Sequence, residues 1–257
     1  MAVQNDSVPA LERALNILEY LTNYPQGVSL KEISDELNIP SASAFRLIKN
    51  LLRRGYVMES TTNGATTYTL GAKLLGLVHS QGNYAPLTLA AKPIMHKLAY
   101  QLLQTVQLGV WQNGSMIYVE QEVSPAPLSM LAALYEPLDI NLSASAKVLM
   151  GFLSKEECAR ALDNCPFIAR SPKTITCKEQ FWNAIQLSKQ QGHSYDDEEF
   201  ALGLGCLAVP IYDASHQCIA ALGITGSVQE YHDPIMFDTM LTSLKNASDM
   251  ITQRLCV

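Results

Sequence analysis

The sequence predicts an α+β chain built from two parts, and three observations lead to this prediction. The chain has 257 residues, which suggests about two domains at ~150 residues per domain. Residues 1–70 contain short helical patterns followed by a strand pair, whereas helical and strand patterns alternate from Leu87 onwards. The composition, 48% hydrophobic and 16% charged, is that of a folded chain and excludes a disordered one.

The first part is expected to contain three helices and a β-hairpin. The second helix opens at a capping box formed by Ser29 and Glu32. Pro40 forces a turn before the third helix, and Gly55 ends that helix. Asn63-Gly64 is a strong hairpin signal. The expected elements are a helix that Ser7 and Pro9 open and whose apolar face runs from Leu11 to Leu21, a short helix with Ile33 and Leu37 on its apolar face, a helix at about 41–54, and strands at 56–58 and 66–70.

A connecting helix and a hinge are expected to separate the two parts. Leucine and valine residues between Gly71 and Gly82 favour a helix, and the glycine and proline of residues 82–86 favour a hinge. We therefore expect domains at 7–70 and 87–257, joined by residues 71–86. In the second domain the expected helices are 87–103, 144–153, 155–162, 179–191 and 235–254, and the expected strands are 106–110, 116–122, 207–212 and 218–225.

Charge is distributed unevenly along the chain. The net charge of −6 and the pI of about 5.4 argue against a protein that coats nucleic acid non-specifically. Residues 37–58, however, hold Arg46, Lys49, Arg53 and Arg54 and not one acid. The sequence therefore predicts a local basic face on an acidic protein.

The cysteines and histidines follow no metal-binding pattern. None of the six cysteines lies within three residues of another, and the five histidines form neither HxH nor HExxH. We therefore expect no zinc site and no cofactor. The sequence shows no apolar run of ~18 residues and no secretory signal, so we expect a cytoplasmic protein with free thiols and no membrane partner.

Residues 41–54 form an amphipathic helix suited to DNA. At ~100° per residue, an apolar side around Ile48 can pack on the two preceding helices, while the opposite side begins with small side chains and ends in cations. In a recognition helix the first turn meets base edges and the cations reach phosphates. The predicted DNA contacts are Ser41, Ala42, Ser43, Arg46, Lys49, Arg53 and Arg54 on the helix and Thr66 and Thr67 on the hairpin.

The predicted contacts divide into base and phosphate contacts. Arg46 can form two hydrogen bonds to guanine, worth ~1–3 kcal/mol of discrimination. Ser41 and Ser43 can donate to a phosphate or a base, the other cations suit phosphates, and the hairpin threonines can touch the backbone as a wing. The alternative is an ordinary solvated helix face, but helix, turn, helix and hairpin in this order favour a winged helix-turn-helix. With four phosphate contacts per copy, the logarithm of the DNA-binding constant falls with the logarithm of the salt concentration with a slope (the salt slope) of only about −4. One copy would bind weakly, so we expect at least a dimer on an inverted repeat.

Four segments of the second part could carry chemistry. Gly203–Ala208 matches GxGxxA, but a strand follows where a dinucleotide site needs a helix, so we reject that site. The four acids Asp196–Glu199 are expected to lie mostly in a solvated loop or at a helix N-terminus, with room for one that faces inward. Cys206 could be a nucleophile with His193 as its base, although a small buried thiol is favoured. The helix start in Asn141–Lys147 could bind an anion or be ordinarily capped.

These segments together resemble the IclR family of bacterial transcription regulators. The stretches ALERALNILEYL, SLKEISDELNIPSASAFRLIKNLLRRGYV and TTYTLGAKLLGL resemble the family's winged helix-turn-helix and linker helix, and QGHSYDDEEFALGLGCLAVPIYDASHQCIAALGITG resembles its effector loop. The resemblance spans about Ser7 to Ile251. It implies a C-terminal GAF-like α/β effector-binding domain with a curved antiparallel sheet, and homodimers or dimers of dimers on palindromic operators.

The resemblance also implies an effector site. Its positions in this sequence are Met130, Ala144, Ser145, Asp196, Cys206, Gly223 and Thr225. This chain departs from the family's pattern where Ala146 replaces a frequent glycine, where Asn141 replaces a frequent histidine, and where Gly223 offers no hydroxyl. Ser143 and Ser145 add hydroxyls, which favours an acid more hydroxylated than a simple keto acid, for example a sugar acid.

The sequence therefore predicts a DNA-binding transcription regulator that is not an enzyme. More specifically it predicts a repressor controlled by a small carboxylate or sugar acid. Two alternatives stay open. A cysteine-dependent hydrolase that uses Cys206 would lose turnover in Cys206→Ala, and a metabolite-binding module whose helix-turn-helix serves only protein contacts would show salt-independent partner binding without DNA affinity.

Overall fold

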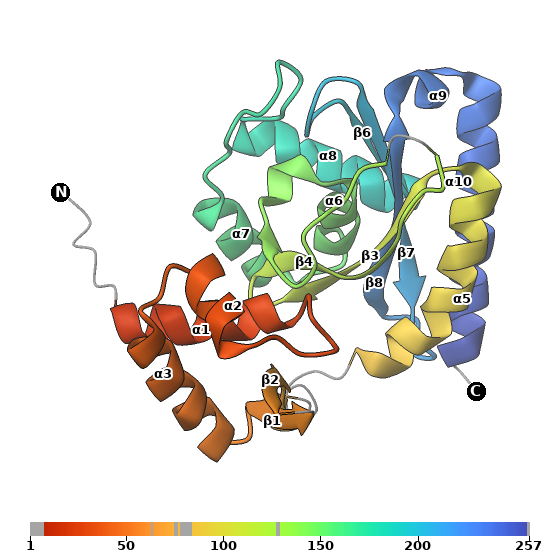
Figure 1. Cartoon of the computed structure of the whole chain (residues 1–257). Coiled ribbons are helices and arrows are strands. Elements are labelled where there is room, and N and C mark those ends of the chain that lie inside the picture. Colours follow the sequence, from red (N-terminus) through yellow and green to blue (C-terminus); the bar gives the residue numbers. More distant parts are fainter. Residues whose placement is uncertain (1–7, 63, 75–76, 78–83, 127–128, 256–257) are drawn as a thin grey trace. The chain divides into compact units, whose positions relative to one another are not determined.

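The computed structural model describes residues 8–62, 64–74, 77, 84–126 and 129–255 (Figure 1). The chain forms two compact units that divide between Asn83 and Tyr84. Most of the connecting helix and part of the hinge expected over 71–86 lie outside the described residues. Each unit is therefore described by itself.

The smaller unit has a helix-turn-helix followed by a β-hairpin, as predicted. The strands pair antiparallel, from Val57 opposite Leu70 to Thr62 opposite Ala65. Both strands are longer than the sequence indicated because their ladder continues almost to the Asn63-Gly64 turn. The elements are α1 (Pro9–Leu21), α2 (Leu30–Glu36), α3 (Ser41–Arg53), β1 (Val57–Thr62) and β2 (Ala65–Leu70).

Local signals fix the ends of α2 and its turn into α3. The predicted capping box is present: Glu32 N donates to Ser29 Oγ at 3.2 Å, and Ser29 N donates to Glu32 Oε2 at 2.9 Å. Asn38 takes the left-handed conformation with φ of 51°, which turns the chain towards α3. The helices enclose a small apolar core of Ile17, Leu21, Val28, Ile33, Ile39, Ala44, Ile48, Val57 and Tyr68.

The larger unit is built on a six-stranded antiparallel sheet. Its strand order is β5-β4-β3-β8-β7-β6, so the first and last halves of the unit meet at the β3–β8 pair. The strands are β3 (Thr105–Gln112), β4 (Ser115–Glu122), β5 (Pro137–Leu138), β6 (Ser194–Asp197), β7 (Leu204–Tyr212) and β8 (Cys218–Ser227). The helices are α5 (Ala85–Leu102), η1 (Ile140–Leu142), α6 (Ala144–Met150), α7 (Lys155–Asn164), α8 (Lys178–Gln191), α9 (Val228–His232) and α10 (Pro234–Leu255).

Helices cover both faces of this sheet. On one face α5 and α10 lie side by side, and on the other α6 packs on β7 and β8 and is itself covered by α8 (Figure 1). Each face has its own apolar core, one centred on Leu108 and Leu222 and the other on Met116 and Phe181. The predicted α+β architecture with an antiparallel sheet is confirmed.

The acidic run Asp196–Glu199 differs from its prediction. Its first two acids end strand β6, where Asp196 lies opposite Cys206 of β7. Asp196 is 0% exposed and Glu199 is 8% exposed, so two of the four acids are buried, whereas the prediction allowed for one. The local sequence could not indicate this burial, because it depends on a distant cation, Lys147 on α6, which pairs with Glu199.

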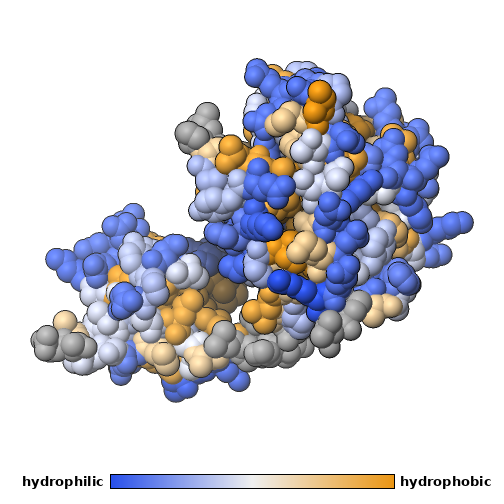
Figure 2. Space-filling view, turned by 90° about the vertical axis from the view of Figure 1, so that its right-hand side faces the viewer, coloured by the Kyte–Doolittle hydropathy of each residue, from blue (hydrophilic) through white to orange (hydrophobic). Residues whose placement is uncertain are grey.

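The visible face of the larger unit is mostly hydrophilic, with hydrophobic side chains dispersed over it (Figure 2). Dispersed apolar side chains are normal on a protein surface. Among the described residues, no helix combines the length and the apolar character needed to cross a bilayer.

Candidate nucleic-acid interface and effector pocket

Helix α3 separates a buried apolar side from an exposed side, as predicted. Ala44 and Ile48 are 0% exposed and pack in the core of the smaller unit. On the opposite side most of the predicted DNA contacts are exposed and Ser43 is half-buried: Ser41, Ala42, Ser43, Arg46, Lys49, Arg53 and Arg54. The helix therefore carries small side chains in its first turn and cations towards its end on one accessible face.

Intramolecular contacts already hold several cations of this face. Lys49 Nζ lies 3.3 Å from Glu59 Oε2 on β1. Arg53 donates to Asn50 Oδ1 at 2.9 Å, and Asn50 Nδ2 donates to the carbonyl of Arg46 at 2.9 Å. No hydrogen bond or ion pair of the Arg46 guanidinium occurs among the described residues, which leaves its five N–H donors for an outside partner.

The Ser41 hydroxyl has an internal partner. Ser34 donates its hydroxyl proton to the carbonyl of Ile39 at 2.7 Å. Ser41 must therefore be the donor in the 2.9 Å contact between the two serine hydroxyls. Its proton joins α2 to α3, so the predicted donation from Ser41 to a phosphate or base requires this bond to break.

The two predicted wing residues face in opposite directions, because neighbouring strand residues alternate. Thr67 Oγ1 lies over Gly27: a Cβ on Gly27 would come within 2.9 Å of it, and Gly27 has φ of +93°. Thr67 therefore shapes the turn before α2. Thr66 Oγ1 lies 3.2 Å from Thr61 Oγ1 on the other side of the hairpin.

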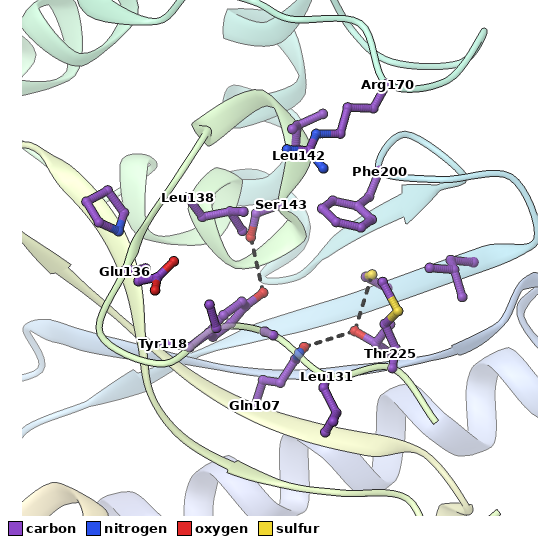
Figure 3. Close-up of a pocket in the computed structure, with 16 residues that line it drawn as sticks. Gln107, Tyr118, Leu131, Glu136, Leu138, Leu142, Ser143, Arg170, Phe200 and Thr225 are labelled. Atoms are coloured by element: carbon purple, nitrogen blue, oxygen red, sulfur yellow. Dashed lines mark hydrogen bonds between the residues drawn. The ribbon is translucent and has the colours of Figure 1, made fainter. Parts of the chain in front are cut away.

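The larger unit contains a cavity of about 280 Å³ between the sheet and the start of α6 (Figure 3). Of the predicted effector residues, Met130, Cys206 and Thr225 line it, whereas Ala144, Ser145, Asp196 and Gly223 do not. The lining residues are Gln107, Tyr118, Met130, Leu131, Ala132, Ala133, Glu136, Pro137, Leu138, Leu142, Ser143, Arg170, Phe200, Leu204, Cys206 and Thr225.

Polar contacts mark the floor of the cavity. Thr225 Oγ1 donates to Gln107 Oε1 at 2.9 Å and also lies 3.3 Å from Cys206 Sγ (Figure 3). Tyr118 Oη lies 3.4 Å from Ser143 Oγ. Sequence reasoning missed Gln107 and Tyr118, although a polar residue between the apolar Val106 and Leu108 in a predicted strand was a usable signal.

The start of α6 packs against β8 behind this cavity. Ser143 caps the helix by accepting from Ala146 N at 3.3 Å. Ser145 stands over Gly223, since a Cβ on that glycine would come within 3.1 Å of Ser145 Oγ. The Ser145 hydroxyl therefore lies beside Gly223, but neither residue lines the cavity.

A buried cluster of charges adjoins Cys206. Lys147 is 2% exposed, and its Nζ lies 2.5 and 2.6 Å from the Glu199 carboxylate oxygens. Asp196 Oδ1 accepts from Glu199 N at 2.6 Å, while its buried Oδ2 has no partner among the described residues. Burial, and next the negative charge of Glu199, raise the pKa of Asp196 to about 6.

The chemistry of Cys206 does not suit a nucleophile. Burial, followed by the Asp196 carboxylate, raises the pKa of its thiol well above the ordinary value. His193, its predicted base, has Nδ1 3.2 Å from the carbonyl of Gln191 and its ring beside Phe237. Cys206 instead contacts Thr225. In the described part of the chain no cluster of three His, Cys, Asp or Glu side chains could hold a metal ion.

Comparisons with known proteins agree with both units. A family model described as "IclR helix-turn-helix domain" matches residues 10–60, and one described as "Bacterial transcriptional regulator IclR C-terminal" matches residues 83–253. The transcriptional repressor AllR of Salmonella typhimurium is 29% identical over 217 residues, which are 84% of this chain and 79% of that protein.

Two solved structures show the same fold. The Thermotoga maritima IclR is 22% identical with a TM-score of 0.74, over 96% of this chain and 98% of that one. An IclR homologue from Microbacterium hydrocarbonoxydans, complexed with 4-hydroxybenzoate, is 20% identical with a TM-score of 0.72 over the same shares. Because the family models cover both units and more than half of the residues, this chain belongs to the IclR family of bacterial DNA-binding transcription regulators.

Proposed function

We propose that this chain is a repressor that binds an inverted-repeat operator and that an organic acid in the cavity of the larger unit controls its affinity. The observation that carries the proposal is the exposed face of α3, where an unpaired Arg46 lies among small side chains and further cations. The name of AllR supports repression. The Microbacterium homologue, solved with 4-hydroxybenzoate, supports an acid as the effector.

The charge of the α3 face supports a dimer or a dimer of dimers on DNA. Four cations per copy give a salt slope of only about −4, so one copy alone would have a low affinity for DNA. Two copies related by a two-fold axis double the number of contacts and match an inverted repeat.

The cavity can supply the energy that such control needs. A tenfold change in operator affinity requires an effector that favours one state by ~1.4 kcal/mol. One or two net hydrogen bonds of about 0.5–1.5 kcal/mol each are enough, and Thr225, Gln107, Tyr118 and Ser143 offer polar groups. We propose a carboxylate as the effector.

Selection of binding sites from chromosomal fragments with the full chain tests the proposal. We expect the enriched fragments to share an inverted repeat. A variant with Arg46→Glu and Lys49→Glu should enrich nothing, whereas a control with the same charge change off the face, Arg13→Glu and Lys31→Glu, should retain the repeat. Enrichment of no fragment by a folded wild-type protein would reject DNA binding and favour the module that makes only protein contacts.

A further inference from the structure

Arg170 is the one cation among the described residues that line the cavity. Its guanidinium lies over the ring of Phe200, 5.3 Å from the centroid. No hydrogen bond or ion pair of this guanidinium occurs in the described part of the chain. Arg170 reaches towards Leu142 and Phe200, at the end of the cavity opposite the Gln107–Thr225 contact (Figure 3).

The loop that carries Arg170 is fixed from inside the fold. Asn141 is 0% exposed, and its Nδ2 donates to the carbonyls of Ile168 at 3.2 Å and Ile175 at 3.0 Å. These two carbonyls flank Arg170 in sequence. One buried amide therefore fixes the loop backbone on both sides of Arg170, whose side chain is exposed.

The same loop is fixed to the segment that carries Phe200. Ser171 donates its hydroxyl to the carbonyl of Glu198 at 2.6 Å, and Thr174 donates to the carbonyl of Glu199 at 2.6 Å. The Thr174 hydroxyl also accepts from the backbone N–H of Arg170 at 3.1 Å. Arg170 and Phe200 thus belong to one hydrogen-bonded assembly at the mouth of the cavity.

The charges around the cavity disfavour an anion at its floor. The unpartnered carboxylate oxygen of Asp196 lies behind Cys206, and Glu136 lies on the Tyr118 side, away from Arg170 (Figure 3). The positive charge of Lys147 is not free to bind a ligand's acid group, because its ammonium group already contacts the Glu199 carboxylate. Among the described lining residues, a positive charge that can stabilise an acid group is therefore found only at the Arg170 end.

The floor suits a hydroxyl, and the walls suit an apolar body. Thr225 gives its one hydroxyl proton to Gln107, so its oxygen can accept a hydrogen bond from a ligand. Between floor and mouth, a ligand with many hydroxyls would leave most of them unpaired at a cost. The apolar lining residues are Met130, Leu131, Ala132, Ala133, Pro137, Leu138, Leu142, Phe200 and Leu204.

We infer that Arg170 binds the carboxylate of the effector at the mouth, and that this effector has a flat apolar body and a hydroxyl that reaches Thr225. The inference rests on the proposed function, in which an acid occupies this cavity. It favours an aromatic hydroxy acid over a sugar acid. The cavity, at about 280 Å³, is at the small end of ligand pockets, which suits one ring with two substituents.

Titration calorimetry on the full chain tests this with acids matched to their neutral amides. The pairs are 4-hydroxybenzoate with 4-hydroxybenzamide, 4-hydroxyphenylacetate with its amide, and 4-hydroxycinnamate with its amide, and gluconate serves as a sugar acid. We expect the wild-type protein to bind at least one hydroxy acid more tightly than its amide and more tightly than gluconate.

Variants of the arginine then separate the carboxylate contact from the rest of the cavity. Arg170→Met should weaken binding of the acid by roughly 10- to 100-fold and leave the amide unchanged, because a charge-assisted pair is lost. Arg170→Lys should fall between, since a lysine keeps the charge but not the planar fork. Arg160→Met, on an exposed turn of α7, is the control with the same loss of charge and should bind like the wild type.

Three outcomes would overturn the inference: no binding of any hydroxy acid by the wild-type protein, tighter binding of gluconate, or an acid affinity that Arg170→Met does not change. Failure of the proposed function gives a different result. If no operator is selected, the proposed function is refuted whatever the calorimetry shows. If the protein selects an operator but Arg170→Met leaves its affinity for the acid unchanged, only this inference is refuted.

Discussion

The exposed face of α3 and the cavity of the larger unit are assembled in opposite ways. Helix α3 supplies its exposed face from 13 consecutive residues, so helical periodicity alone determines which side chains share it. The cavity takes its lining from separate segments between Gln107 and Thr225, which meet only when the sheet forms. Substitutions on the α3 face should therefore change DNA binding at nearly constant stability, whereas those beside the cavity should change stability first.

The largest effect is expected from Lys147→Met beside the cavity. It leaves the buried Glu199 carboxylate, and Asp196 next to it, without their cation. Breaking a buried pair by removing one partner costs about 3–5 kcal/mol of unfolding free energy. Urea denaturation measures this loss, and the double variant with Glu199→Gln should recover a large part of it. Equal stability of Lys147→Met and the wild type would contradict the cluster's role.

Asp196→Asn is expected to stabilise the protein at neutral pH. The pKa of Asp196 is raised to about 6 in the folded protein from an ordinary 3.8, so the folded state binds its proton more tightly. Stability from this group is therefore present below pH ~4 and is lost as pH rises to ~6, a loss of about 3 kcal/mol at ~1.36 kcal/mol per pH unit. The amide avoids that loss.

Unfolding curves at several pH values test the Asp196 prediction. The stability advantage of Asp196→Asn should grow from pH 4.5 to pH 7.5 and then stay constant, whereas the exposed Asp238→Asn should follow the wild type throughout. Burial also raises the pKa of the neighbouring Glu199, against the opposing effect of Lys147. Glu199 is present in both proteins. An advantage that is the same at every pH would refute the raised pKa as its cause.

On α3 the expected effects are smaller and concern binding. Lys49 lies on the exposed face of α3, where its ammonium group contacts Glu59 and lies over the Phe45 ring. Lys49→Gln should weaken binding about equally for all DNA sequences and reduce the salt slope by about 1 per copy. Anisotropy titrations over a series of salt concentrations measure this, with Arg13→Gln as the control. A change in sequence preference instead would assign Lys49 to a base.

This contrast also explains how far the sequence could predict the structure. The capping box at Ser29, the turn at Pro40 and the Asn63-Gly64 hairpin are local signals, and they predicted the smaller unit correctly. Strand β6 was missed because acidic residues disfavour a strand. Cations from elsewhere in the chain offset its acids: Lys173 and His232 pair with Asp197, and the charge of Lys147 acts on Asp196. These contacts have no signature in the local sequence.

The candidate sites show the same division. The exposed face of α3 was predicted residue by residue, but the internal bond between Ser41 and Ser34 was not, because it depends on the angle between two helices. Of the cavity lining, Met130, Cys206 and Thr225 came from the family resemblance. Arg170 lies in an irregular loop, which is brought to the cavity by hydrogen bonds of Asn141, Ser171 and Thr174 that no local sequence pattern indicates.

Methylation interference on a selected operator is the most direct test of the claim that α3 reads DNA through Arg46. A methyl group on guanine N7 blocks the two-bond contact of an arginine in the major groove. We predict that N7 methylation of one guanine in each half-site prevents wild-type binding, and that Arg46→Ala binds more weakly but loses this sensitivity. Identical interference patterns for the two proteins, or no sensitive guanine in the wild type, would contradict the account.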